Sequence, residues 1–196
     1  FIVVAMLGAS FSYGWTFTNT WLYIGFLLVC MLASIGGGAL AHANDSPGVS
    51  LVGGGICAIA MGIMVGPFVA LFTAASVAQA LALAAIVVLA TGAIGALLPQ
   101  DLSAWGAPLF GLLLGAIFIQ FGGIILAAFG VNMRLVFGIL DCVVLLLVSA
   151  IMLYDLNMAK RLDMTLNNAI DVAVNVFVNF MNIFIRILSI LGKSKS

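Results

Sequence analysis

Polar side chains follow one line along the last apolar stretch of the sequence, residues 169–192. This stretch is hydrophobic enough to enter a bilayer, yet it holds six polar residues. They are Asp171, Asn175, Asn179, Asn182, Arg186 and Ser189. Wound as a helix at about 100° per residue, the six fall within one arc about 80° wide. Because polar groups inside a membrane face protein or water, we expect this arc to avoid lipid and its helix to be the most buried one.

The carboxylates in the preceding apolar stretch are the second group that could do chemistry. Asp141 and Asp155 lie 14 residues apart, which places them about 40° apart around a helix and ~21 Å apart along it. At that separation they cannot share a proton as a protease dyad does. A charge at the bilayer centre costs ~2.5–3.5 kcal/mol, so each acid needs a partner or a function.

Asp155 and Asp171 both lie within a few turns of the connection at residues 157–165. A hairpin of the last two helices would therefore bring these two acids near one another, as candidate titratable gates of an ion path. The predicted ion path or gate consists of Asp155, Asp171, Asn175, Asn179 and Asn182.

Arg186 has a candidate partner at its own depth. It lies six residues before Gly192, and Asp141 lies seven residues after Arg134. In two antiparallel helices these offsets correspond to ~9 and ~10 Å from the same membrane side. Because an ion pair removes two uncompensated charges at once, we predict a structural ion pair between Asp141 and Arg186.

Composition identifies the class of protein. The chain is 65% hydrophobic and 6% charged, with a mean hydropathy of +1.36, whereas soluble domains are roughly 45–50% apolar and about 25% charged. The sequence therefore predicts an integral membrane protein. Its net charge is zero and it has six basic residues, which excludes a nucleic-acid surface, because neutralising phosphates needs clustered Lys and Arg.

Enzyme and metal chemistry have no support in the motifs. The sequence contains no HExxH, GxSxG or P-loop motif and no Ser/His/Asp set, so we expect no enzymatic activity. Cys30, Cys57 and Cys142 each lie in an apolar segment without a second Cys or His at ligand spacing. We therefore expect no metal site and no cofactor.

Apolar runs of about 20 residues, separated by polar or Pro/Gly breaks, predict the elements that position these residues. The predicted helices cover residues 1–16, 21–41, 48–72, 76–98, 105–129, 134–156 and 166–191, and we expect the first to be truncated. The breaks are too short for a separate soluble domain. The sequence thus predicts an all-α integral membrane protein with seven transmembrane helices in a single polytopic domain, residues 1–196.

Two GxxxG spacings predict close helix packing. Gly62 and Gly66 form one in the third predicted helix, and Gly111 with Gly115 forms another in the fifth, because small residues let backbones approach. Pro67 follows Gly66 directly, and its ring and missing N–H should kink or break the third helix there.

The residues alone leave three interpretations of the polar arc open. The first is structural, with asparagines hydrogen-bonding between helices at ~0.6 kcal/mol each. The second is a hydrated path for an ion or a proton with carboxylate gates. The third is a contact surface for a partner protein.

Three strings in the sequence resemble the Bax inhibitor-1/YccA family, the transmembrane Bax inhibitor motif proteins, and in particular its bacterial YccA-like branch. They are "GIMVGPFVALF" at 62–72, "LYDLN" at 153–157 and "FVNFMNIFIRILSILG" at 177–192. The resemblance covers nearly the whole chain from the second helix onward. It implies seven transmembrane helices with helix seven central, a cytoplasmic N-terminus and a place in the bacterial inner membrane.

The same resemblance implies a function. Family members are pH-sensitive calcium or cation leak pathways, in which an acid on helix six and a second acid on helix seven sense pH. Asp155 matches the first acid, but Asn179 stands at the second. The resemblance therefore implies that Asp155 is the remaining titratable gate and that Asn179 is its neighbour on helix seven. A basic latch is also expected on the second helix, and residues 21–41 contain no Lys or Arg. We therefore expect a calcium or proton leak with weakened pH gating.

The alternative that the resemblance implies is binding rather than transport. Members of the YccA-like branch modulate a membrane-bound AAA protease. The expected partners are thus the lipid bilayer, calcium or protons, or such a protease, and no nucleic acid.

Overall fold

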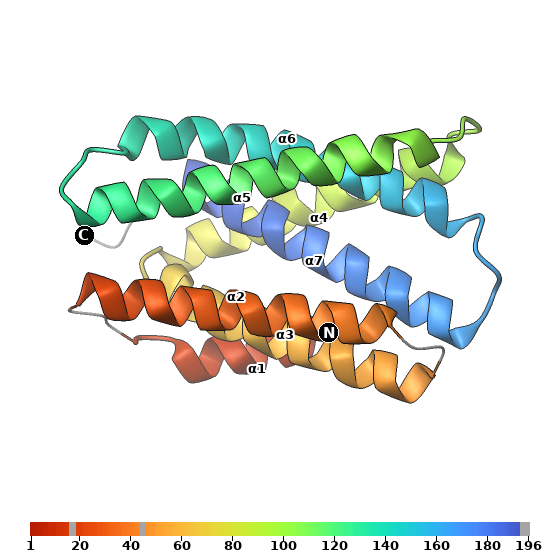
Figure 1. Cartoon of the computed structure of the whole chain (residues 1–196), viewed down its shortest axis with the longest axis horizontal. Coiled ribbons are helices and arrows are strands. Elements are labelled where there is room, and N and C mark those ends of the chain that lie inside the picture. Colours follow the sequence, from red (N-terminus) through yellow and green to blue (C-terminus); the bar gives the residue numbers. More distant parts are fainter. Residues whose placement is uncertain (16–18, 44–45, 193–196) are drawn as a thin grey trace. The chain divides into compact units, whose positions relative to one another are not determined.

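The computed structural model describes residues 1–15, 19–43 and 46–192, and every regular element in these ranges is helical (Figure 1). The α-helices are α1 Ile2–Ser12, α2 Thr20–His42, α3 Pro47–Val69, α4 Ala74–Leu97, α5 Gly106–Ala128, α6 Arg134–Ala159 and α7 Leu166–Leu191, and a short 3-10 helix, η1, covers Ser103–Trp105. The predicted all-α class is confirmed.

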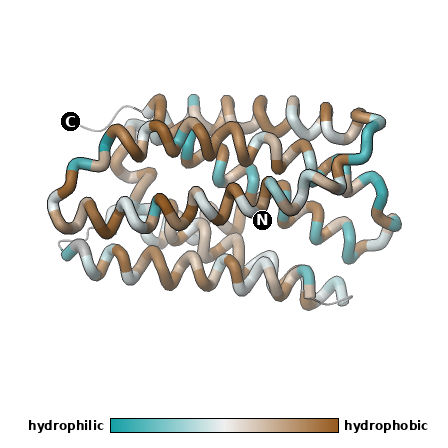
Figure 2. Tube along the Cα trace, turned by 45° about the horizontal axis from the view of Figure 1, so that its top comes forward, coloured by the Kyte–Doolittle hydropathy of each residue, from teal (hydrophilic) through white to brown (hydrophobic). Residues whose placement is uncertain are grey.

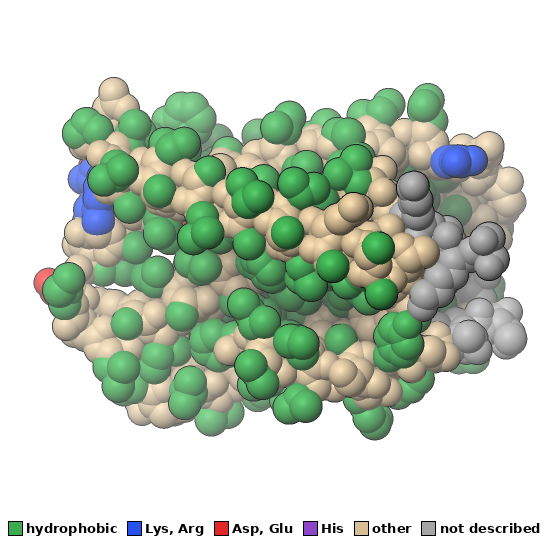
Figure 3. All heavy atoms as spheres, turned by 180° about the vertical axis from the view of Figure 1, so that it is seen from behind, with side chains coloured by type: hydrophobic (Ala, Val, Ile, Leu, Met, Phe, Trp, Pro, Cys, Tyr) green, Lys and Arg blue, Asp and Glu red, His purple; other side chains and the backbone are tan. Residues whose placement is uncertain are grey.

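Among the described helices, six are long and apolar enough to cross a membrane, α2 to α7. Hydrophobic residues run along most of their length in Figure 2, and in Figure 3 hydrophobic side chains spread over the visible face. The seventh predicted span is not confirmed, because α1 has 11 residues, about 16 Å at 1.5 Å per residue, against a hydrocarbon core of ~30 Å. The helix ends before Gly14, whose φ of 85° is left-handed and interrupts the helix.

The described chain forms two compact units. The first contains α1, α2, α3 and residues 163–178, which include the first half of α7. Here α1 and α2 both pack on α3. The approach is close because a Cβ at Gly53 of α3 would lie 2.5 Å from the Ala41 backbone N, and one at Gly62 would lie 2.1 Å from the Ala5 carbonyl oxygen. The close packing predicted for Gly62 and Gly66 is thus confirmed.

The predicted helix break at Gly66 and Pro67 is wrong in its position. α3 continues through both residues and ends at Val69. Proline cannot donate to the carbonyl of residue i−4, here Ile63. The Ser12 hydroxyl of α1 donates to that carbonyl at 2.8 Å instead, and it fits there because a Cβ at Gly66 would lie 2.1 Å from the Ser12 oxygen.

The second unit contains α4, η1, α5, α6 and residues 179–192 of α7. α6 packs on both α4 and α5. The buried face of α4 is built from small side chains, namely Ser76, Ala80, Ala84, Val88, Gly92 and Gly95. A Cβ at Gly95 would lie 2.1 Å from the carbonyl oxygen of Leu153 on α6, so the two helices meet backbone to backbone.

The glycine pair on α5 does not pack as predicted. A Cβ at Gly111 or at Gly115 would meet no atom within 4 Å. The buried residues of α5 are Leu109, Ala116 and Gly123, which recur every seven residues and define a different face. The GxxxG spacing alone therefore does not predict which glycine pair packs against a neighbouring helix.

The expectation that helix seven is the most buried helix is wrong. In the most apolar window of each long helix, 50% of the residues of α3 are buried, compared with 44% for α7. The glycines of α3 explain the difference, because they let α1 and α2 approach its backbone. The central position of helix seven and the single domain stay predictions.

Candidate functional site

The second unit brings together two of the predicted gate residues, Asp155 of α6 and Asn179 of α7. The Asn179 Nδ2 atom donates to Asp155 Oδ2 at 2.7 Å and lies 3.8 Å from the sulfur of Met152. Asn179 is 6% exposed and Met152 is 2% exposed, while Asp155 is half-buried. An uncharged amide of α7 therefore donates to the carboxylate of α6.

A second polar cluster lies 14 residues earlier on α6, where Asp141 is 8% exposed. Arg186 Nη1 donates to Asp141 Oδ1 at 2.6 Å, and the Ser189 hydroxyl donates to the other carboxylate oxygen. Arg186 Nη2 donates to Gln120 Oε1 of α5 at 2.7 Å. The predicted partners are thus in contact, and three helices contribute to one cluster.

Sequence reasoning missed Gln120 in this cluster. It is an amide inside the apolar string "GAIFIQFGGII" of α5. Gln120 could have been recognised in the same way as Asn179, because a polar side chain in an apolar helix of spanning length needs a hydrogen-bond partner. The Arg186 Nε atom is buried and has no hydrogen-bond partner among the described residues.

Asp171 belongs to the first unit and has a different environment. Asn167 Nδ2 lies 3.4 Å from Asp171 Oδ2, and the Ser50 hydroxyl oxygen of α3 lies 2.7 Å from both Asn167 Oδ1 and the Ala41 carbonyl oxygen. Asp171 Oδ1 is buried without a partner in the described part of the chain. Ser50 and Asn167 were not among the predicted site residues, although Asn167 begins the string "NNAID".

The remaining predicted path residues are divided between the two units. Asn175 lies in the first and Asn182 in the second, and both are half-buried. Gly66 and Pro67 are buried in the first unit, where they serve the contact between α1 and α3. The polar arc of α7 therefore contributes to both units, and in the second unit its hydrogen bonds connect it to α5 and α6.

Asn157, two residues after Asp155, fixes the end of α6 that carries the gate pair. It is 0% exposed, and its Nδ2 atom lies 3.1 Å from the carbonyl oxygens of Gly95, Leu98 and Gln100. Its Oδ1 atom accepts the backbone N–H of Leu102 at 3.3 Å. The amide thus contacts the Gly95 carbonyl near the C-terminus of α4 and two carbonyls of the α4–α5 connection, and it holds this connection against α6.

The same connection carries an exposed ion pair. Arg161 Nη1 lies 2.9 Å from Asp101 Oδ2, and Lys160 donates to the Leu98 carbonyl. The pKa of Asp101 is lowered, first because its carboxylate accepts the backbone N–H of Ser103 and then because the Ser103 hydroxyl and the charge of Arg161 favour the ionised form. An exposed pair of this kind contributes little to stability.

The Asp141 cluster is reached from one end of the second unit. A pocket of about 660 Å³ is lined by Asp141 and Ser189 together with residues of the α5–α6 connection and the first turns of α6. Asn132 and Arg134 lie at this end. The paired carboxylate is therefore accessible from the loop side, although it is nearly buried.

Comparison with known proteins gives one result for the whole chain. The family model described as "Inhibitor of apoptosis-promoting Bax1" matches residues 1–196. No curated protein matches the sequence.

Proposed function

The chain belongs to the Bax inhibitor-1 family and is a multi-pass membrane protein, and on that premise we propose that it is a cation leak pathway, for calcium or protons, with a weakened pH gate. The gate in this proposal is Asp155 with Asn179. The path residues are Asp171, Asn175 and Asn182, and the pair of Asp141 with Arg186 is structural.

The hydrogen bond of 2.7 Å between Asn179 and Asp155 is the observation that carries the proposal. This bond connects α6 and α7, two helices that are long and apolar enough to cross a membrane. Asn179 contributes a hydrogen-bond donor but no charge to the Asp155 carboxylate. Placing a carboxylate inside a membrane-spanning helix costs free energy, so such a residue is a candidate for a function. With a single acid at this point, protonation changes the charge of the gate by one unit, whereas a two-acid gate changes by up to two.

The cluster around Asp141 supports a structural rather than a gating role for the second pair. Both carboxylate oxygens accept hydrogen bonds, and the guanidinium also binds Gln120. A cation would have to displace Arg186 to reach this carboxylate, so the proposal assigns the path to Asp155 and Asp171 instead.

We place the protein in a bacterial inner membrane with its N-terminus in the cytoplasm, as the family resemblance implies. A role as modulator of a membrane-bound AAA protease is the alternative. The two functions make different predictions for the purified protein. A leak pathway conducts ions by itself, whereas a protein that only binds a protease need not conduct ions.

Ion flux through purified protein in liposomes tests the proposal. Vesicles loaded with a calcium indicator or a pH indicator should report flux for the wild type and a several-fold smaller flux for Asp155→Asn. Asp163→Asn is the matched control, because Asp163 is an exposed acid in the α6–α7 connection, and its flux should equal that of the wild type. Wild-type vesicles no leakier than empty ones, or an Asp155→Asn flux equal to wild type, would contradict the proposal.

A further inference from the structure

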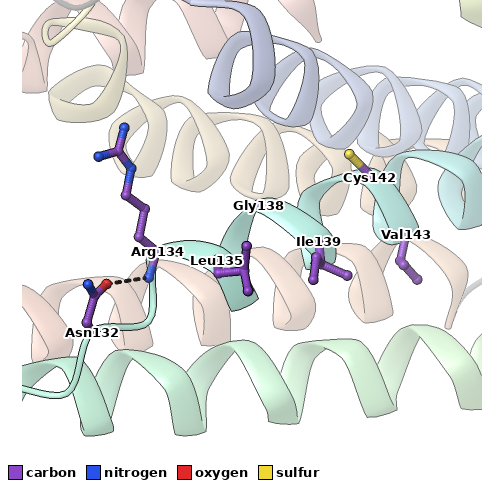
Figure 4. A pocket seen from close by; sticks show the side chains of 7 residues that line it. All are labelled: Asn132, Arg134, Leu135, Gly138, Ile139, Cys142 and Val143. Carbon is purple, nitrogen blue, oxygen red and sulfur yellow. Dashed lines mark hydrogen bonds between the residues drawn. The ribbon is translucent and has the colours of Figure 1, made fainter.

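Arg134, the first residue of α6, is a cation without a side-chain partner among the residues that the structure describes. Within the described ranges, Lys160, Arg161 and Arg186 all bind an acceptor. Arg134 makes no such contact among the described residues, and it is exposed. Figure 4 shows its side chain extended, with the guanidinium away from Asn132, whose Oδ1 accepts the Arg134 backbone N–H at 3.2 Å.

An apolar groove begins next to this charge. A pocket of about 730 Å³ is lined by Asn132, Arg134, Leu135, Gly138, Ile139, Cys142 and Val143 (Figure 4). From Leu135 onward these residues follow one another at alternating intervals of three and one, so they share one face of α6. Leu135, Ile139 and Val143 are 78%, 58% and 50% exposed, so the wall of the groove is not covered by the second unit.

Gly138 forms an open place in the wall. A Cβ at this position would meet no atom within 4 Å. The missing side chain therefore leaves room that the chain itself does not fill, between the exposed Leu135 and Val143. An apolar molecule in the groove would make van der Waals contacts along this face that the protein itself does not make.

The charge and the groove together fit one kind of occupant. α6 is a membrane-grade helix, so the bilayer surrounds its exposed apolar face, and a basic residue at its end lies near the level of the lipid headgroups. The acid among the described residues that line this pocket and its neighbour is Asp141, which is already paired with Arg186. Within the described part of the chain, the positive charge of Arg134 is thus uncompensated.

We propose that this face of α6 binds an anionic phospholipid, with the headgroup phosphate at Arg134 and an acyl chain in the groove along Leu135, Gly138, Ile139 and Val143. Anionic lipids are preferred because a zwitterionic headgroup brings a cation of its own. Basic residues beside a membrane contribute about 1 kcal/mol each toward anionic lipid, which corresponds to about a five-fold preference. This site is independent of whether ions flow through the protein.

Native mass spectrometry of the full-length chain tests the site with two lipids that share acyl chains, phosphatidylglycerol and phosphatidylcholine. The wild type should bind phosphatidylglycerol about five-fold more tightly. Arg134→Gln should remove this preference and Arg134→Lys should keep most of it. Because Arg134 has no protein partner in the described residues, the thermal unfolding of Arg134→Gln without added lipid should match the wild type.

Filling the groove tests the acyl-chain half of the proposal. Gly138→Leu should lower the occupancy of both lipids several-fold, and Gly111→Leu is the matched control, because a side chain at Gly111 of α5 also meets open space. Equal affinity of the wild type for the two lipids would overturn the proposal, as would a preference that survives in Arg134→Gln. Binding that is unchanged in Gly138→Leu would place the lipid elsewhere and overturn the groove.

Discussion

The carboxylate of Asp141 illustrates how one charge is held within an apolar helix. It accepts a guanidinium bond at 2.6 Å on one oxygen and the Ser189 hydroxyl on the other. The guanidinium in turn binds Gln120 on α5. Because the charges are compensated locally, the cost of placing them in an apolar environment is reduced, and removing either charge leaves the other buried and unpaired.

Charge exchange at this pair tests the arrangement at the residue scale. Asp141→Arg alone and Arg186→Asp alone should each abolish folded protein, since breaking a buried pair costs ~3–5 kcal/mol in soluble proteins. The double exchange should recover part of the folded yield, because Gln120 and Ser189 can both donate and accept. Fluorescence-detected size-exclusion chromatography measures the yield.

A milder variant provides the control for that experiment. Ser189→Ala removes one hydrogen bond of about 1 kcal/mol and keeps the ion pair, so it should fold. A double exchange that recovers no more protein than the single variants would contradict the pairing.

Residue-scale prediction from the sequence worked where periodicity supplied the geometry. The wheel of α7 and the matched depths on α6 identified Arg186 and Asp141 as neighbours, and the structure holds them 2.6 Å apart. Gln120, Asn157 and Ser50 could not be paired in advance. Their partners lie 66, 62 and 117 residues away, and a helix period carries no information about which distant segment lies opposite.

At the scale of elements, small residues determine which helices touch. α3 receives α1 and α2 through glycines whose missing side chains would overlap the neighbouring backbone. α4 does the same with α6 at Gly95. The helix boundaries were largely predictable because each apolar run is ended by polar or Pro/Gly residues. Which GxxxG pair packs against another helix was not predictable, because the spacing is identical on a packed face and on an open one.

The two GxxxG pairs therefore predict opposite outcomes for the same substitution. Gly62→Ala should destabilise the protein by about 1–3 kcal/mol, because its Cβ would lie 2.1 Å from the Ala5 carbonyl oxygen and α1 would have to shift. Gly111→Ala meets open space and should be neutral or stabilising by up to ~1 kcal/mol through helix propensity. Thermal unfolding of both variants in detergent measures the difference, and a Gly62→Ala variant as stable as Gly111→Ala would show that α1 does not pack there.

At the scale of the whole molecule, composition and family agree on an integral membrane protein. Six described helices have spanning length and the family model covers the chain from end to end. The sequence predicted a seventh span at residues 1–16, but the helix there ends at Ser12 before a left-handed glycine. Hydrophobicity marked the segment correctly as apolar, while the C-terminal end of its helix depended on the local backbone conformation at Gly14.

The function proposed for the molecule rests on having one acid where related proteins have two. Asn179 supplies an amide donor to Asp155 at 2.7 Å, so the gate contains a single titratable group. Replacing Asn179 with an acid would place two carboxylates within hydrogen-bond distance, where they would share a proton up to a higher pH. If the path opens only when both acids have lost their protons, the last proton to leave sets the response, which therefore moves to higher pH.

The pH profile of flux in liposomes, compared between the wild type and Asn179→Asp, tests this claim most directly. We predict that the profile of Asn179→Asp is shifted to higher pH than that of the wild type. Asn132→Asp is the control, since it adds an acid at an exposed position of the α5–α6 connection and should leave the profile near that of the wild type. A profile of Asn179→Asp that coincides with that of the wild type would contradict the account.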